Sequence, residues 1–373
     1  MLQHPVALAA VLVGLVLAIQ VASGQRGLRW AFAITPVPFW CYLLPMLGTT
    51  AGWWPSQSPL YTWLSAHLLP VCLVLLLLGT DLPALARMSR HALLVMLAGS
   101  GGIMLGMVTA TWVWRRWLPP TAWQGLGALA GSWTGGSMNL LAVKEALGAP
   151  DAAIAPVILV DTVVAYSWMA LLLLLSTRGR RAHALHEEAG QSQDRPRLVA
   201  LATALTLAVV IAEGLRHVGA AMPARAGFSA ITWSILLVTT GTLVLSLTPL
   251  ARLGRDPGVG RLGTTCLFVL LASIGARADA RALGQAPAFL AAGVTAVLIH
   301  GLVLLLVGWR FRVALGLLAT ASQANVGGVV SAPLVAAAYD RSLAPMGLLM
   351  AVLGNVIGTY AGLLTAALCR TLR

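Results

Sequence analysis

The stretch GSWTGGSMNLLAVKEALG, residues 131–148, places glycines, hydroxyl side chains, an amide and a Lys–Glu pair between apolar segments. Of the 373 residues, 59% are hydrophobic and 9% are charged, whereas soluble domains are roughly half apolar and a quarter charged. Apolar stretches of about 20 residues, the length of a bilayer-spanning helix, recur along the chain. We therefore expect an all-α, polytopic transmembrane bundle of about 10 to 12 helices in contact with lipid.

The apolar stretches predict helical spans in two groups, separated by one long hydrophilic segment. The arginine-rich segment at 176–197 predicts a cytoplasmic linker between a first membrane repeat, 1–175, and a second, 198–373. The segment at 28–59 is interrupted by Pro36, Pro38, Pro45 and Pro55 and is either a span or a re-entrant or interfacial segment. The predicted spans are 6–23, 34–51, 60–79, 91–114, 121–147 and 152–175, then 198–218, 227–249, 260–275, 286–308, 312–338 and 344–369.

The two halves resemble each other at nearly one offset. A second glycine-rich stretch, LATASQANVGGVVSAPLVAAAYD, occupies residues 318–340. Paired segments interrupted by glycine are the best sequence indication of a secondary transporter and of its binding site. The matched pairs are Cys72 and Cys266, Asp161 and Asn355, and Tyr166 and Tyr360, each 194 residues apart, with Gly135 and Gly136 matching Gly327 and Gly328 at 192.

An interrupted helix frees backbone N–H and C=O groups, and its two ends carry opposite partial charges that can hold ions or anionic groups. Small residues also serve tight helix packing, which is the alternative explanation of each stretch taken alone. From both stretches, and from the two helices that follow them, we predict a substrate- or ion-binding set: Ser132, Thr134, Gly135, Gly136, Ser137, Asn139, Asp161, Ser322, Gln323, Asn325, Gly327, Gly328 and Asn355.

Asp161 lies well inside an apolar span, where a charge costs at least about 2.5 kcal/mol. It is expected to couple transport to H⁺ or Na⁺, or else to be a protonated aspartate hydrogen-bonded between helices.

Three further residues are weaker candidates. Lys144 either pairs with an acid or anion or extends toward the membrane surface, His300 is either titratable or packed, and Tyr360 is a repeat partner. Glu213 is expected near the membrane interface.

Several other classes of function lack support in the sequence. The net charge of +13 comes from scattered arginines, which predict membrane topology rather than binding to nucleic acid. The four cysteines lack the spacing of metal ligands, and we expect no metal or other cofactor. No catalytic motif indicates an enzyme. An ion channel or pore, a non-transport membrane scaffold and an enzyme remain the alternatives to a transporter.

A resemblance to a known family spans essentially the whole chain. It is carried by the motifs GSWTGGSMNLLAVKEALG, ILVDTVVAYSWM, ASQANVGGVVSAPLVAAAY and VLGNVIGTYAGLL. They resemble the bacterial and plant integral-membrane proteins of domain-of-unknown-function family 819, which has no settled activity. More distantly, the layout resembles the cation:proton antiporter and anion transporter superfamily.

That distant resemblance implies a core domain with two crossed, unwound helices, here 121–147 and 312–338, a separate scaffold domain and a homodimer. Asp161 would then resemble a coupling carboxylate. The repeats of that superfamily are inverted, whereas six spans per half give parallel repeats. The sequence thus predicts a secondary active transporter of the inner cell membrane, driven by H⁺ or Na⁺, for a small polar or anionic solute.

Overall fold

The computed structural model describes residues 4–28, 31–32, 35–176, 198–223, 230–278 and 280–372. Every regular element in these ranges is helical, which confirms the predicted all-α class. Apart from Ser176, the linker predicted at 176–197 lies outside the described residues. The boundaries of the remaining helices fall close to those of the predicted spans.

The chain forms two compact units, and each unit combines segments from both halves of the sequence. Unit 1 comprises Met1–Thr80, Gly148–Thr162 and Arg195–Ala286, and unit 2 comprises Asp81–Leu147, Val163–Asp194 and Pro287–Arg373. Helix α10, Asp151–Leu175, contributes to both units. The two compact units therefore divide the chain differently from the two predicted sequence repeats.

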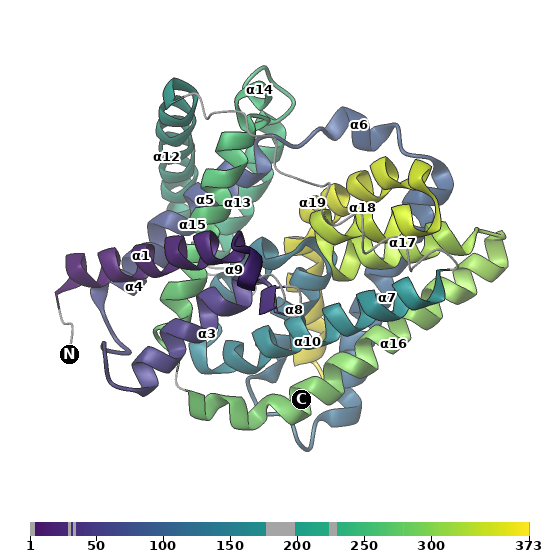
Figure 1. The fold of residues 1–373 in the computed structure, drawn as a ribbon, viewed down its shortest axis with the longest axis horizontal. Helices are drawn as coiled ribbons and strands as arrows, with labels where there is room; N and C mark the ends of the chain where they lie inside the picture. Colours follow the sequence, from purple (N-terminus) through teal and green to yellow (C-terminus); the bar gives the residue numbers. More distant parts are fainter. Residues whose placement is uncertain are drawn as a thin grey trace. The chain divides into compact units, whose positions relative to one another are not determined.

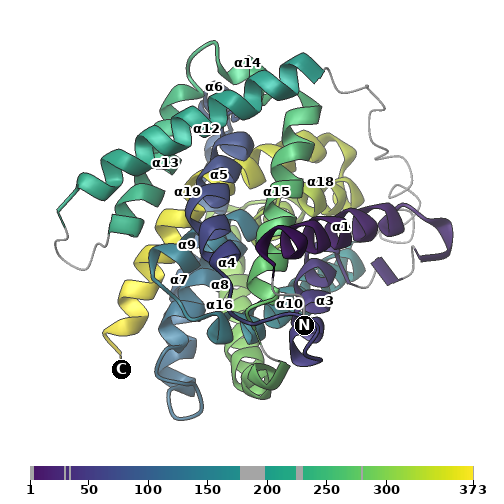
Figure 2. The same ribbon diagram turned by 90° about the vertical axis from the view of Figure 1, so that its left-hand side faces the viewer.

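Unit 1 contains the helices that begin each half of the chain. α12 and α13 lie side by side (Figure 2), and Gly219 of α12 allows the backbone of Ser234 to approach. The elements are α1 (Pro5–Ser23), η1 (Arg26–Leu28), α3 (Val37–Thr50), α4 (Pro59–Trp63), η2 (Leu64–Leu68), α5 (Leu69–Leu77), α12 (Leu198–Ala221), α13 (Ala230–Leu245), α14 (Ala251–Gly254), α15 (Pro257–Gly275) and η3 (Ala280–Gln285).

One helix of unit 1 widens at its centre. Between α4 and α5, η2 is a π-helical turn in which Leu69 N–H donates to the carbonyl of Leu64. Pro70, which has no N–H to donate, follows at once. Single π-turns within α-helices are frequent at functional sites, and this one contains His67.

Unit 2 contains both glycine-rich stretches, and each forms two short helices instead of one long helix. Their breaks lie at Gly136 and at Gly327–Gly328, where the sequence predicts them. The elements are α6 (Leu82–Ala86), α7 (Arg90–Trp114), α8 (Ala122–Gly135), α9 (Ser137–Ala146), α16 (Ala286–Phe311), α17 (Leu315–Val326), α18 (Gly328–Tyr339), η4 (Arg341–Leu343) and α19 (Ala344–Arg370).

Side-chain caps fix several helix starts in both units. Ser89 Oγ accepts a hydrogen bond from Ala92 N–H at the start of α7. Asp256 accepts from Gly258 N–H and is followed by proline at the first position of α15. Such caps satisfy donors that the first turn of a helix leaves unpaired. The helix starts are thus set by local sequence.

Eight helices in the described ranges are long and apolar enough to cross a membrane, so the chain is a multi-pass membrane protein. Two shorter apolar helices in the same ranges are α13, Ala230–Leu245, and α18, Gly328–Tyr339, the second part of an interrupted helix. The eight are Pro5–Ser23, Pro59–Leu77, Arg90–Trp114, Ala153–Leu175, Leu198–Ala221, Pro257–Gly275, Leu283–Phe311 and Arg341–Arg370.

Glycines and alanines let the helices of unit 2 pack with their backbones close together. Helices α7 and α16 run side by side (Figure 1), where Gly102 and Gly106 face the backbones of His300 and Ala296. Helices α8 and α19 meet along two stripes of glycine with four-residue spacing: Gly127, Gly131 and Gly135 on α8, and Gly354, Gly358 and Gly362 on α19. Such stripes are typical of membrane helix pairs.

Candidate functional site

The first helix break lies between α8 and α9. Gly136 has a φ of +81°, a conformation that glycine adopts without the steric cost of a β-carbon. Its N–H donates to the carbonyl of Ser132 at 2.5 Å, which closes the last turn of α8. The next helix then begins at Ser137. The glycine pair thus has two roles, because Gly135 allows close packing against α19 and Gly136 turns the chain.

Asn139 fastens the two sides of the first break to α19. Its side chain is 1% exposed, and its Nδ2 donates to the carbonyl of Gly135 at 2.5 Å and to that of Asn355 at 3.4 Å. Its Oδ1 accepts a hydrogen bond from Thr359 Oγ1 at 2.6 Å. A single amide therefore satisfies a carbonyl that the end of α8 would leave unpaired and fixes α9 against α19.

The second break, between α17 and α18, has a comparable construction. Gly328 has a φ of +74°, and Gly327 N–H donates to the carbonyl of Gln323 at 2.8 Å. Across the break, Gln323 Nε2 donates to Ser331 Oγ at 2.8 Å. Ser331 lies 192 residues after Asn139. In both breaks, a polar side chain near the start of the second short helix bonds back to the last turn of the first.

Asn325 holds the end of α17 against α7. It is fully buried, and its Oδ1 accepts a hydrogen bond from Ser100 Oγ at 2.8 Å. Its Nδ2 donates to the carbonyl of Ala321 at 3.0 Å and to that of Met96 at 3.3 Å. The amide has partners on both of its heteroatoms, so it acts as a structural anchor of the second break.

A hydrogen-bonded chain through Ser322 joins three helices to α17. His300 Nδ1 lies 2.8 Å from the carbonyl of Gly99, and His300 Nε2 lies 2.9 Å from Ser322 Oγ. Because a carbonyl can only accept, Nδ1 carries the proton, and in neutral histidine Ser322 Oγ–H donates to Nε2. Trp168 Nε1 of α10 donates to Ser322 Oγ at 2.8 Å. His300, for which the sequence showed no partner, is therefore fully bonded.

Met96 and Gly354 connect the two breaks within unit 2. Met96 Sδ lies 3.3 Å from Asn325 Nδ2 of the second break. A β-carbon built on Gly354 would lie 3.1 Å from Met96 Cε and would overlap the carbonyl oxygen of Thr134, next to the first break. Helix α8 also contacts both α17 and α18. The two breaks thus belong to one packed region.

Each break also contains a buried side-chain oxygen that makes no hydrogen bond. These atoms are Thr134 Oγ1 and Gln323 Oε1, on side chains that are 0% and 1% exposed. Leaving such an atom unpaired costs about 1–3 kcal/mol. An acceptor oxygen in this situation can bind a cation or a hydrogen-bond donor of a solute.

The other predicted residues have more varied surroundings. Ser132 is buried, whereas Ser137 and Asn355 are half-buried. Lys144 is 2% exposed and pairs with Glu145 at 2.7 Å, so it does not extend toward a surface. Tyr360 is 37% exposed, in contrast to the adjacent Thr359, which is fully buried.

Asp161 is half-buried and belongs to the part of α10 in unit 1, whereas both breaks lie in unit 2. Asp161 and Trp168 are seven residues apart, and therefore lie on nearly the same face of α10, about two turns from each other. Trp168, in the part of α10 that belongs to unit 2, contacts the second break.

Sequence reasoning missed the residues that hold the breaks from neighbouring helices: Met96, Ser100, Trp168, Gly354 and Thr359. The four-residue spacing of Gly354, Gly358 and Gly362 was a signal that could have identified the face of α19 that packs on α8. The others are ordinary residues of apolar spans. Their roles depend on helix pairing that one sequence does not specify.

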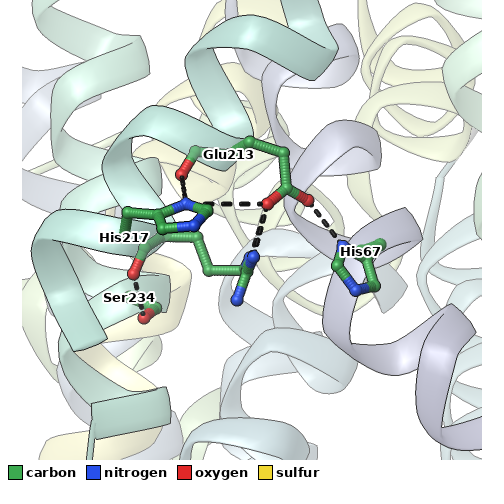
Figure 3. Close-up of polar contacts among 5 residues, drawn as sticks. His67, Glu213, His217 and Ser234 are labelled. Atoms are coloured by element: carbon green, nitrogen blue, oxygen red, sulfur yellow. Dashed lines mark hydrogen bonds and ion pairs between the residues drawn. The ribbon is translucent and has the colours of Figure 1, made fainter.

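Sequence reasoning also missed a second polar cluster, in unit 1 (Figure 3). Glu213 Oε1 of α12 lies 2.6 Å from His67 Nδ1, and Glu213 Oε2 accepts from Arg216 Nη2 at 2.6 Å. His67 is next to Leu68, the central residue of the span Pro59–Leu77. Glu213, which is predicted to lie near the interface, thus pairs with a residue at the middle of another apolar span.

Comparisons with known proteins agree with a membrane protein of this kind. A family model described as "Protein of unknown function (DUF819)" matches residues 7–372. The chain is similar to the uncharacterized membrane protein YjcL of Bacillus subtilis (strain 168). The two sequences are 27% identical over 372 aligned residues, which cover 92% of each chain.

Proposed function

We propose that this chain, which belongs to the DUF819 family, is a secondary active transporter of the cytoplasmic membrane. Its substrate would be a small polar or anionic solute, and its driving force a gradient of H⁺ or Na⁺. The multi-pass architecture provides the setting for this function.

One observation carries the proposal: two interrupted helices in one compact unit each present a buried oxygen without a partner at their break. Of the nine buried side-chain atoms without a hydrogen bond in the described residues, Thr134 Oγ1 and Gln323 Oε1 are the two oxygens that lie at the helix breaks. Valine or leucine would fill the same space without the cost of an unpaired oxygen. The unsatisfied oxygens therefore support a binding role for the breaks.

The chemistry of the breaks favours small solutes. Interrupted helices present N–H groups at the start of the second segment and carbonyls at the end of the first, and these bind anionic groups and cations respectively. The side chains identified at the two breaks are amides and hydroxyls, which are neutral. We infer a solute held by hydrogen bonds and helix dipoles rather than by a full counter-charge.

Asp161 is the proposed coupling group. It is an intramembrane carboxylate on the face of α10 that also carries Trp168, a residue bonded to the second break. Binding of a cation at Asp161 would change the charge of that face.

A two-stage experiment tests the proposal. Purified protein is first screened by thermal shift against inorganic ions and metabolites, because a ligand that binds only the native state raises its stability. Uptake of each stabilising solute is then measured in proteoliposomes under imposed pH or Na⁺ gradients. We expect saturable, gradient-driven uptake that Asp161→Asn uncouples without loss of folding. Full gradient-driven uptake by that variant would refute the coupling role of Asp161. Unitary currents would show that the protein is a channel and not a carrier.

A further inference from the structure

Glu213 is the centre of a charged cluster in unit 1 (Figure 3). Its carboxylate lies 2.6 Å from His67 Nδ1, accepts from Arg216 Nε and Nη2 at 2.8 and 2.6 Å, and lies 3.8 Å from His217 Nδ1. Ser234 of α13 fixes the backbone beneath the cluster, because its Oγ donates to the carbonyl of Arg216 at 3.2 Å. Three helical segments therefore hold the arrangement in place.

The cluster lies near the middle of two apolar spans. Glu213 is about 5 Å along the axis from the middle of α12, and His67 is at the middle of its own span. Ionisable residues in such positions are costly, and they commonly form proton or ion pathways. An ion pair that served only to join helices could be replaced by apolar packing at little or no loss of stability.

The charges of the cluster identify the group that can change. Glu213 and Arg216 compensate each other, so the arrangement is neutral when both histidines are neutral. Two residues before His67, Ser65 accepts a hydrogen bond from Arg277 at 3.4 Å, and Arg277 is paired with Asp151 at 2.6 Å. His217 is 73% exposed and farther from the carboxylate. His67 is therefore the histidine that contacts the Glu213 carboxylate most closely.

The surroundings of His67 suit an imidazolium. Its Nδ1–H donates to the Glu213 carboxylate in the neutral tautomer, so an incoming proton would bind Nε2. The ring stacks on Trp63 with centroids 5.2 Å apart and planes inclined by 30°. An aromatic face stabilises a cation, and a carboxylate at this distance stabilises it further.

The cluster is also accessible. His67, Glu213 and Arg216 have side chains that are 34%, 28% and 27% exposed. Charged groups within membranes face protein or a water-filled cavity rather than lipid. Water at the exposed side of the cluster would supply and remove the proton.

We propose that His67 and Glu213 of unit 1 form a proton-binding site that carries a coupling proton of the transporter. A proton from water binds Nε2 of neutral His67, and the resulting imidazolium is held by the Glu213 carboxylate; release reverses the step. The coupling role rests on the proposed transport function, whereas proton binding itself does not.

Proton binding is tested without any solute. Protein labelled with ¹³C and ¹⁵N in histidine is titrated in nanodiscs between pH 8 and pH 5 and followed by NMR. The chain has seven histidines, and the His67 signal is assigned as the one that is lost in His67→Gln. We expect this signal to respond to protonation of the ring, and folded Glu213→Gln to weaken that response because it removes the carboxylate that contacts Nδ1. The His217 signal, assigned with His217→Gln, is the internal control and should change less. A His67 signal that does not titrate, or that is unchanged in folded Glu213→Gln, would overturn the site.

The coupling role is tested separately with a pH-sensitive dye inside proteoliposomes. With a solute identified in the thermal-shift screen, we expect wild-type uptake to move protons and folded His67→Gln to lose that movement. Unchanged proton movement in His67→Gln would refute the coupling role even if His67 titrates. Failure of every solute to be transported would refute the proposed function and the coupling role, but would leave the measured proton site in place.

Discussion

Thr359 donates a hydrogen bond to Asn139 across 2.6 Å and joins α19 to the start of α9 directly after the first helix break. Both side chains are buried. Because Asn139 also bonds the last carbonyl of α8, this one contact positions both sides of the break. The break is thus held by specific hydrogen bonds, and its geometry depends on a residue 220 positions away in the sequence.

Loss of the Thr359 hydroxyl should destabilise the protein. Thr359→Val keeps the shape of the side chain but leaves Asn139 Oδ1 buried without this donor, at an expected cost of about 1–3 kcal/mol. Thermal unfolding in detergent measures the effect. Thr365→Val is the matched control, because the buried Thr365 hydroxyl bonds only a carbonyl of its own helix, that of Ala361. Equal losses in the two variants would contradict a special role for the Asn139 contact.

Gly354→Ala should disturb the contact between α8 and α19. A β-carbon at this position would overlap the carbonyl oxygen of Thr134, and a backbone atom cannot move aside cheaply. We expect a loss of about 1–3 kcal/mol in unfolding free energy. At Gly101 of α7, nothing lies within 4 Å of a built β-carbon, so Gly101→Ala should be neutral or stabilising by up to about 1 kcal/mol. A tolerated Gly354→Ala would show that the helices are farther apart than described.

Ser322→Ala should be among the most destabilising polar substitutions in unit 2. It removes the partner of both His300 Nε2 and Trp168 Nε1, and we expect a cost of about 2–4 kcal/mol from two unsatisfied buried groups. On the same helix, the Thr320 hydroxyl bonds only the carbonyl of Gly316, so Thr320→Val should cost less than about 1 kcal/mol. Both variants are compared by thermal unfolding. Similar losses of stability in the two variants would argue against the hydrogen-bonded chain of His300, Ser322 and Trp168.

The topology of the first half can be tested by labelling single cysteines. Helix α3 has 14 residues and spans about 21 Å, less than the roughly 30 Å of a bilayer core. We therefore expect cysteines placed at Arg29 and Trp54 to be labelled from the same side of the membrane, and one placed at Arg87 from the opposite side. Five crossings in the first half would then invert the second half relative to it. Labelling of positions 29 and 54 from opposite sides would restore six crossings and parallel repeats.

The sequence predicted the helices and both breaks well, because each depends on local information. Apolar length sets the spans, and glycine at Gly136 and Gly328 permits the positive φ of the breaks. The candidate residues at the breaks were identified by type, since buried amides and hydroxyls require partners. Their binding role stays a prediction.

The partners of those residues could not be predicted, because they come from distant helices. Nothing in the sequence around Ser100 or Trp168 distinguishes them from other residues of apolar spans. The contact between Glu213 and His67 was missed for the same reason, since it depends on the pairing of α12 with the helix that contains η2. The relative orientation of the two predicted repeats and the identity of the substrate are tested by the experiments described above.

The effect of Thr134→Val on ligand-induced stabilisation tests the central claim most directly. Thr134 Oγ1 is buried without a hydrogen bond, so the substitution should leave the unfolding temperature of ligand-free protein unchanged or raise it. It should also abolish or strongly reduce the thermal shift produced by the solutes and ions that stabilise the wild type, whereas Thr365→Val retains that shift. An unchanged ligand-induced shift in Thr134→Val, combined with reduced stability of the ligand-free protein, would show that this oxygen is structural and would contradict a binding site at the helix breaks.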